Sequence, residues 1–311
     1  ALAGDADVVL LNSDTEVGPR WLSALKLAAY ADDSVGTVTA VSDNAGAFSV
    51  PELEHYCPIP ARWELLQAQR AVLQQAGLRY PQLPTGNGFC MYIKRAVLAR
   101  IGAMDEVAFP VGFGEENDFC QRAERAGYRN IIAGNVLVHH QRSASFGDAR
   151  RAELGAHGMQ VLRERYPDYE NEIAATLHSF ARRALDYRIR RAYADGDRGY
   201  AAPAPRPRLL IAADDGDARA QRLLAALEHR HEGFLLRRKG GWVNLYRHTA
   251  SSLAFERGVA IGNGAAALRD VENRLREWMI AYAIESLHTL GTAASDGWLT
   301  GLAAGLEIPT A

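Results

Sequence analysis

The chain has 311 residues, of which 48% are hydrophobic and 23% charged, and its 35 basic and 37 acidic side chains give a formal net charge of −2. This length and composition predict about two globular domains with substantial hydrophobic cores. The charge balance argues against nucleic-acid binding and against electrostatic attachment to a membrane. We find no apolar run long enough to span a membrane and no secretory-signal pattern, so we expect neither a membrane span nor secretion.

The cysteines are three in number and lie far apart, at Cys57, Cys90 and Cys120. Their spacing fits neither a metal site nor a redox motif. We therefore expect reduced thiols in the core of a cytosolic protein.

The first predicted element is a buried strand over residues 6–11, followed by the polar residues Asn12, Ser13 and Asp14. Ligands of open α/β sheets bind at the carboxyl ends of strands. Two oxygen-bearing side chains one residue apart, Asn12 and Asp14, can both face Mg²⁺ or Mn²⁺. A well-capped turn between strand and helix explains the same residues equally well.

A helix is expected from Pro19 to Ala29, a strand over 35–41 and a second helix over 61–76. The segment Thr85-Gly86-Asn87-Gly88 then precedes a buried strand that ends near Ile93. Its two glycines let the backbone approach a ligand closely. A tight turn is the alternative.

Three acidic residues, Glu115, Glu116 and Asp118, lie where a glycine-flanked loop becomes a helix that we expect to stop at Gly127. The positive end of a helix favours ionised carboxylates. The position suits a general base or the outer shell of a metal site. Acidic residues are also ordinary in the first turn of a helix, so this pattern alone is not specific.

Two short strands are expected over residues 130–133 and 136–138, and they lead to His139 and His140. Because side chains alternate along a strand, only one of these histidines can point into a site. A lone histidine at a sheet edge is usually a surface residue. The polar loop that follows, which includes Arg142 and Ser143, is suited to closing over an anionic ligand.

The remainder of the chain predicts flanking helices, a linker and a second unit. Helices are expected over 149–166 and 169–194, with a solvated arginine-rich face formed by Arg182, Arg183, Arg188, Arg190 and Arg191. The proline-rich residues 196–207 read as a linker. A new unit then opens with a strand over 208–213 and a helix over 218–227. Further strands are expected over 234–236, 242–246 and 285–290, and helices over 268–284 and 298–305.

The order and spacing of these motifs resemble the carboxyl-terminal half of an inverting family-two nucleotide-sugar glycosyltransferase with the GT-A fold. The matching segments are Asn12-Ser13-Asp14-Thr15, Thr85-Gly86-Asn87-Gly88, Ile101-Gly102 with Asp105-Glu106, Gly112 to Asp118 with Arg122, and His140 ahead of Ser143-Ala144-Ser145-Phe146. The resemblance covers residues 1 to about 150. It implies an α/β chain with a partial GT-A, Rossmann-like mixed sheet and flanking helices over residues 1–195. A linker over 196–207 and a smaller, partial Rossmann-like α/β unit over 208–311 follow.

The resemblance also implies roles for individual residues. Asp14 would bind the Mn²⁺ or Mg²⁺ that bridges the donor diphosphate, and His140, with His139 as second choice, would complete the metal site. Glu116 would deprotonate the acceptor hydroxyl. Glu115 and Asp118 would support Glu116 or hold acceptor and helix geometry. Donor or acceptor contacts would come from Asn12, Thr85, Gly86, Asn87, Gly88, Arg142 and Ser143.

Asn12 departs from the family pattern, since many relatives carry there the first aspartate of an Asp-x-Asp motif. The resemblance further implies that the strands holding the nucleobase precede residue 1, so that this polypeptide binds donor weakly. From residue 206 the chain more loosely resembles the start of a GT-B-type glycosyltransferase domain. The implied partners are a nucleotide-diphosphate sugar and a glycan or lipid-linked acceptor, in cell-envelope polysaccharide assembly at the cytoplasmic side of the membrane.

Two other function classes fit the same motifs. A metal-dependent nucleotidyltransferase presents a similar sheet edge and acidic pair to a nucleotide. A non-catalytic glycan-binding or scaffold module would use the acidic residues only to cap a helix. Nucleophilic phosphatase chemistry fits poorly, because Asn12 stands where the nucleophilic aspartate is needed.

Overall fold

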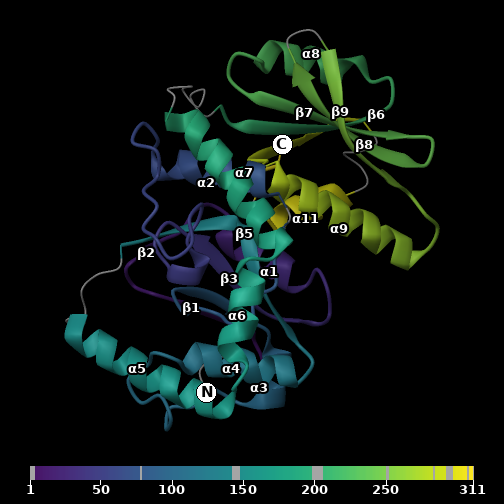
Figure 1. The fold of residues 1–311 in the computed structure, drawn as a ribbon. Coiled ribbons are helices and arrows are strands. Elements are labelled where there is room, and N and C mark those ends of the chain that lie inside the picture. The colour runs from purple at the N-terminus through teal and green to yellow at the C-terminus, as the bar shows by residue number, and fades with distance from the viewer. Residues whose placement is uncertain are drawn as a thin grey trace. The chain divides into compact units, whose positions relative to one another are not determined.

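The computed structural model describes residues 4–77, 79–141, 148–197, 206–249, 252–282, 284–291, 297–306 and 308–310. The chain divides into two compact units, residues 1–200 and 201–311. Each unit is built on a five-stranded mixed sheet with helices around it (Figure 1). The expectation of an α/β chain with a smaller second α/β unit is therefore confirmed.

The sheet of the first unit has β3 (Val35–Ser42) at its centre, and all eight residues of this strand are buried. The strand order is β1 (Val8–Leu11), β4 (Cys90–Ile93), β3, β5 (Arg129–His140) and β2 (Thr15–Glu16). β3 and β5 run parallel, whereas the other neighbouring pairs are antiparallel. The two ends of the polar segment after β1 are thereby brought to opposite edges of the sheet.

The short strand β2 was not expected, because two residues carry no periodicity that a sequence pattern can reveal. It pairs Thr15 with His140 and Glu16 with His139. The pairing folds the segment after β1 back against the end of β5. As a result, Asp14 comes next to the histidine pair.

β5 is one strand of 12 residues rather than the two short strands expected. Its register against β3 jumps after Ala133, which pairs with Ala40, to Leu137, which pairs with Val41. Residues 134–136 form the bulge between the two paired stretches. Gly134 and Asn135, which separate the two expected strands, lie in this bulge.

Helices pack on both faces of the first sheet. α3 (Arg95–Ile101) and α4 (Glu115–Arg125) cover one face, where Met91, Ile93 and Phe119 form a buried cluster. Tyr92 points to the other face and shares the Asp7 carboxylate with Tyr30, which ends α1 (Trp21–Ala29). The remaining helices are η1 (Gly46–Phe48), α2 (Leu65–Ala76), α5 (Asp148–Arg165), α6 (Tyr169–Leu177) and α7 (Phe180–Asp197).

The prediction of reduced thiols in the core is confirmed. Cys57, Cys90 and Cys120 are buried and none forms a disulfide. Burial raises the pKa of Cys90 to about 12. These thiols are protonated parts of the core at neutral pH.

Arg182 was expected to be solvated, and this is wrong. It is 1% exposed, and its Nε atom donates to Asp186 Oδ1 at 2.9 Å, one helical turn along α7. Its terminal nitrogens donate to the carbonyl groups of Ala47 and Ser49. These acceptors compensate the burial of the guanidinium, and a charge count along one helix cannot reveal carbonyls from another part of the chain.

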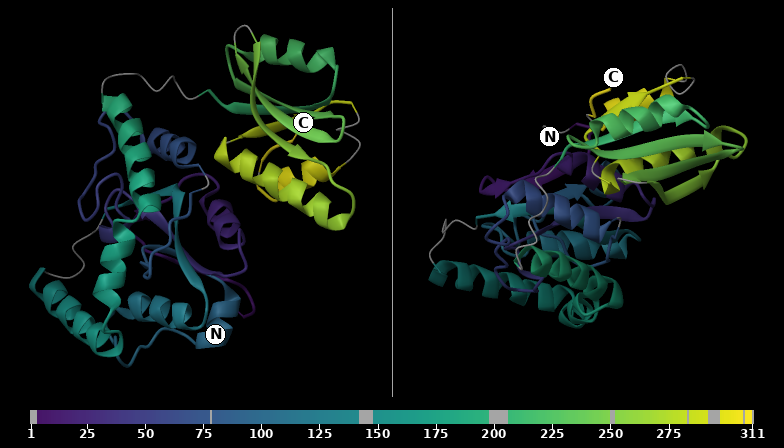
Figure 2. Two further views of the ribbon diagram at one scale, coloured as in Figure 1. Left: turned by 45° about the vertical axis from the view of Figure 1, so that its right-hand side comes forward. Right: turned by 90° about the horizontal axis from the view of Figure 1, so that it is seen from above.

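In the second unit, the sheet order is β10 (Ser286–Thr289), β6 (Arg208–Asp214), β7 (Glu232–Lys239), β8 (Trp242–Thr249) and β9 (Ser252–Ala260). β10, β6 and β7 are parallel, and β7, β8 and β9 are antiparallel. α8 (Ala218–Leu227) lies on one side of this sheet, and α9 (Ala265–Ala281) and α11 (Trp298–Ala304) lie on the other (Figure 2). β9 was not expected, since it is a largely exposed edge strand without an apolar run.

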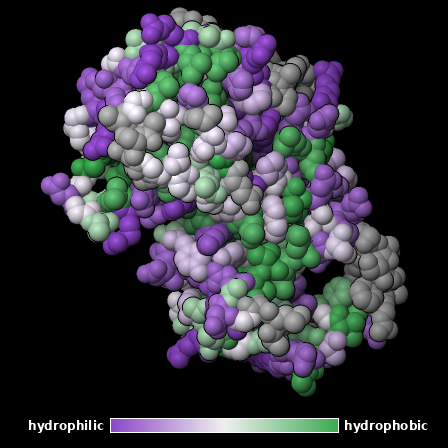
Figure 3. All heavy atoms as spheres, turned by 180° about the vertical axis from the view of Figure 1, so that it is seen from behind, coloured by the Kyte–Doolittle hydropathy of each residue, from purple (hydrophilic) through white to green (hydrophobic). Residues whose placement is uncertain are grey.

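On the face shown in Figure 3, hydrophilic side chains are common and hydrophobic ones gather in a few groups. Exposed large hydrophobic residues occur in both units, among them Val107, Phe180 and Phe255. Within the part of the chain that the structure describes, every helix is too short or too polar to cross a membrane.

We expect Arg182→Met to lower the free energy of unfolding by about 3–5 kcal/mol, because it leaves the Asp186 carboxylate and two carbonyl groups without their buried donor. Arg183→Met is the matched control: Arg183 is exposed on the same helix, and its replacement should change the stability by less than about 0.5 kcal/mol. Urea denaturation of both variants measures the difference. Equal stability losses would contradict the anchoring role of Arg182.

Candidate active site

Asp14 and His140 are brought together at the edge of the first sheet. Asp14 directly precedes β2 and its backbone carbonyl accepts from Gln141 N, while His140 is the last residue of β5. The Oδ1 atom of Asp14 lies 3.4 Å from Nε2 of His140. The two side chains are 20% and 11% exposed, respectively, so the pair remains accessible to a small ligand.

The ring of His140 is held in a defined orientation. Its Nδ1 lies 3.0 Å from the carbonyl oxygen of Asn44, and because a carbonyl only accepts, Nδ1 carries a proton. In the neutral imidazole, Nε2 then presents its lone pair towards the Asp14 carboxylate. Two electron-rich atoms at this distance favour a proton or a cation beside them, and ligands about 2.1 Å from one metal ion are separated by about 3.0–3.4 Å.

The Asp43 carboxylate binds both histidines. It is 1% exposed, its Oδ1 accepts from the backbone N–H of His140 at 3.0 Å, and its Oδ2 lies 2.5 Å from Nδ1 of His139. The two imidazole rings use different partners, Asp43 for His139 and Asn44 with Asp14 for His140, as the alternation of strand side chains predicts. The imidazole that faces Asp14 is that of His140, so the geometry favours His140 over His139 as a metal ligand.

Phe89 and Gly88 connect the histidine end of the site to the acidic turn. The Phe89 ring stacks on the His140 ring with centroids 5.5 Å apart. The backbone carbonyl of Phe89 accepts a hydrogen bond from Asn12 N. The neighbouring Gly88 N–H donates to Glu116 Oε1 at 3.0 Å. Contacts thus run without interruption from Asp14 through His140, Phe89 and Gly88 to Glu116.

Glu116 has the perturbed acidity that a general base requires. Burial, followed by the negative charge of Glu115, raises the pKa of Glu116 to about 7, although the Gly88 hydrogen bond opposes the shift. Near neutral pH the carboxyl group therefore exchanges protons readily. Functional sites are enriched in such shifts, so Glu116 is a candidate for a reactive carboxylate.

Glu115 lies beside Glu116 and closes the loop before α4. Its Oε2 accepts from Gly114 N at 3.0 Å. This bond fixes the first acidic side chain against the backbone and leaves its charge next to Glu116. Its contacts fit a supporting role.

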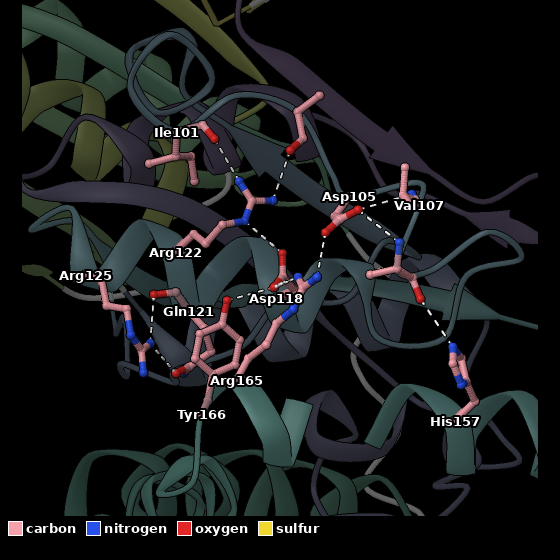
Figure 4. Close-up of polar contacts among 12 residues, drawn as sticks. Ile101, Asp105, Val107, Asp118, Gln121, Arg122, Arg125, His157, Arg165 and Tyr166 are labelled. Atoms are coloured by element: carbon pink, nitrogen blue, oxygen red, sulfur yellow. Dashed lines mark hydrogen bonds and ion pairs between the residues drawn. The ribbon is translucent and has the colours of Figure 1, made fainter. Parts of the chain in front are cut away.

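Asp118 is fully buried and its carboxylate is occupied by three donors. Arg122 Nε donates to Oδ2 at 2.8 Å, while Arg165 and Tyr166 donate to Oδ1 at 2.8 and 2.7 Å (Figure 4). Burial alone would raise the pKa of Asp118, but these hydrogen bonds lower it. Asp118 therefore fits the expected role of holding the helix, as an anchor for α4, and it does not face a ligand.

The segment 85–88 is attached to the first turn of α4. Asn117 Nδ2 donates to Thr85 Oγ1 at 2.6 Å and to the Tyr169 hydroxyl at 2.5 Å. A Cβ atom on Gly86 would lie 2.8 Å from the Met91 side chain, so this glycine serves packing within the protein. Asn87 accepts from Phe89 N and is partly exposed.

The other predicted contact residues lie at the sheet edge or outside the described chain. Asn12 is exposed, and its carbonyl accepts from the Thr15 hydroxyl. Arg142 and Ser143, with the rest of 142–147, lie outside the described residues. A larger metal-binding group is not seen: among the described residues, no three histidine, cysteine or acidic side chains cluster as metal ligands would.

Four residues of the site received no role from sequence reasoning: Asp43, Asn44, Phe89 and Tyr169. They act through hydrogen bonds and ring contacts to residues far away in sequence. Of the four, Asp43 and Asn44 have a local signal, since they are polar residues in the loop that follows the strand expected over 35–41. A scan against protein-family models and a search of curated proteins each return no match for this chain.

Replacing Glu116 by Gln is expected to change how stability depends on pH. A folded-state pKa of about 7 against an ordinary value of 4.5 means that the folded wild type binds the proton more tightly, so its stability falls as the pH rises from 4.5 through 7. Glu116→Gln removes this loss and can still accept the Gly88 hydrogen bond. Relative to wild type, the variant should gain on the order of 1–3 kcal/mol between pH 5 and pH 8.

Urea denaturation of wild type and variant at four pH values measures this gain. Glu153→Gln is a suitable control, because Glu153 is an exposed glutamate for which the same gain is not expected. Stability curves of wild type and Glu116→Gln that run parallel across this pH range would show that the acidity of Glu116 is ordinary.

Proposed function

We propose that this protein transfers a sugar from a nucleotide-diphosphate donor to a hydroxyl group of a glycan or lipid-linked acceptor, with inversion at the sugar carbon. The observation that carries the proposal is the 3.4 Å approach of Asp14 to His140, residues from distant parts of the chain. Their connection through Phe89 and Gly88 to Glu116 supports it further. The mixed sheet, with Asp14 just beyond β1, agrees with a GT-A-type arrangement.

The donor atoms fit Mn²⁺ or Mg²⁺. A carboxylate oxygen and an imidazole nitrogen whose other ring nitrogen is bound to a carbonyl form a common ligand pair, and the imidazole favours Mn²⁺ over Mg²⁺. Asp14 and His140 would hold the ion, and diphosphate oxygens and water would provide its further ligands. When bound, the ion neutralises charge on the departing nucleoside diphosphate.

The reaction needs one reactive carboxylate from the protein. Glu116 accepts the proton of the acceptor hydroxyl, whose oxygen forms the new bond to the sugar carbon as the bond to the diphosphate oxygen breaks. The bonding electron pair leaves with the nucleoside diphosphate. One displacement inverts the sugar carbon, so a second nucleophilic carboxylate is not needed.

The surroundings of Glu116 suit this step. Partial burial and the charge of Glu115 make Glu116 a stronger base than an ordinary glutamate. The Gly88 N–H donates to Glu116 Oε1 at 3.0 Å and so orients the carboxylate. Asp118, held by arginines on α4 and α5, keeps the first turn of α4 in place.

Metal binding tests the ligand pair. Asp14→Asn and His140→Gln should each weaken Mn²⁺ binding at least about 10-fold, measured by electron paramagnetic resonance of free Mn²⁺ with uridine or deoxythymidine diphosphate present. His55→Gln is the control, because His55 is an exposed loop residue, and this variant should bind Mn²⁺ as wild type does. Equal Mn²⁺ affinity in all four proteins would rule out this site.

Sugar transfer tests the base. With a panel of nucleotide sugars, Glu116→Gln should lower the turnover rate about 10²- to 10⁴-fold while leaving Mn²⁺-dependent nucleotide binding intact. The wild-type rate should rise with pH and level off above about 7, because Glu116 must be ionised. Hydrolysis or transfer from nucleoside triphosphates, without any use of nucleotide sugars, would indicate a nucleotidyltransferase. Unchanged transfer in Glu116→Gln would remove this residue from the mechanism.

A further inference from the structure

Gly158, in the middle of α5, lies directly against the loop that leads into the acidic turn. A Cβ atom at this position would come within 1.7 Å of the Phe113 carbonyl oxygen and 3.6 Å of the Gly114 Cα atom. Ordinary contacts between carbon atoms are about 3.5–4.0 Å. The backbone of α5 therefore approaches the loop more closely than any residue with a side chain permits.

The loop beneath Gly158 has an unusual backbone conformation. Gly112, Phe113 and Gly114 all have positive φ angles, of 88°, 69° and 142°. Phe113 is costly in this conformation, because it carries a side chain. Such a conformation persists only where surrounding contacts hold it, and Gly158 supplies a contact to the middle of the three residues.

α5 is fastened on both sides of Gly158. His157 contacts the Ala108 carbonyl through Nε2 at 3.3 Å, and Leu162 packs with Phe109 in a buried cluster. At the end of the helix, Arg165 bridges Asp105 and Asp118 at 2.9 and 2.8 Å (Figure 4). These contacts bind the helix to the whole stretch from residue 105 to the first turn of α4.

We propose that Gly158 is a positioning residue, which lets α5 press the loop 112–114 into the conformation that places Glu115 and Glu116. The carbonyl it contacts is one residue before Gly114, whose N–H holds the Glu115 carboxylate at 3.0 Å. A shift of the loop moves Glu115 relative to Glu116 and to Gly88. The assignment of Glu116 as base rests on the proposed function, whereas the positioning itself does not.

Gly158→Ala and Gly155→Ala form a matched pair on the same helix. A Cβ at Gly155 meets no atom within 4 Å, so the second variant controls for the general effect of alanine in a helix. In Gly158→Ala the displaced loop moves Glu115 away from Glu116 and exposes Glu116 to water. The pH midpoint of the Glu116-dependent stability change should therefore fall by at least about half a unit from wild type. Gly155→Ala should keep the wild-type midpoint.

Transfer activity gives a second readout. Gly158→Ala should lower the turnover rate about 10- to 100-fold with little change in Mn²⁺-dependent nucleotide binding, since Asp14 and His140 belong to the sheet edge at β2 and β5 and not to the loop. If the midpoint falls but no sugar transfer is found in wild type, the positioning stands and the proposed function fails. An unchanged midpoint in Gly158→Ala overturns the positioning, whatever the activity.

A double variant covers the case in which Gly158→Ala does not fold. Adding Phe113→Gly frees the loop to yield, because glycine adopts positive φ angles at little cost. We expect the double variant to fold and to show the lowered midpoint, with Phe113→Gly alone close to wild type. A double variant with the wild-type midpoint would contradict the proposal.

Discussion

The site depends on one backbone hydrogen bond, from Gly88 N–H to the Glu116 carboxylate. It joins the segment that ends beside His140 to the acidic first turn of α4. A Cβ at residue 88 would lie 2.9 Å from Glu116 Oε1, so a larger residue at this position would displace the end of the Glu116 side chain. Phe89, the next residue, stacks on His140, so two consecutive residues hold both halves of the site at a fixed spacing.

The first turn of α4 shows how environment separates similar carboxylates. Asp118 and Glu116 are two residues apart and both are removed from water, yet their pKa values move in opposite directions. Asp118 receives hydrogen bonds from two arginines and a tyrosine, which stabilise its charge. Glu116 receives hydrogen bonds from backbone N–H groups only, and it lies beside Glu115, whose negative charge destabilises the charged form of Glu116. Opposite shifts of this kind distinguish a structural anchor from a group that can exchange protons.

Much of this arrangement was predictable from local patterns. Apolar runs indicated the strands β1, β3, β4 and β6, and glycine with acidic residues marked the beginning of α4. The expectation that the first strand is buried is wrong, because β1 lies at the edge of the sheet and Leu11 is 43% exposed. The edge position of His140 followed from the end of β5. We expected two short strands where the structure has one, because in the sequence a bulge at residues 134–136 looks like a break between strands.

The remaining features depend on contacts between distant residues, which periodicity does not contain. Arg182 is buried because carbonyls of Ala47 and Ser49 accept its hydrogen bonds, although its own helix reads as solvated. Gly158 looks like a weak helix residue until the Phe113 carbonyl is placed against it. β9 pairs through its backbone and lacks the apolar pattern by which strands are recognised.

The most direct measurement is a crystal structure of the protein soaked with Mn²⁺ and a nucleoside diphosphate, with anomalous scattering used to locate the ion. The proposed function predicts an anomalous peak between Asp14 Oδ1 and His140 Nε2, with diphosphate oxygens among the ligands and the Glu116 carboxylate facing the same space. A peak at another place, or a nucleotide bound away from both residues, would contradict it.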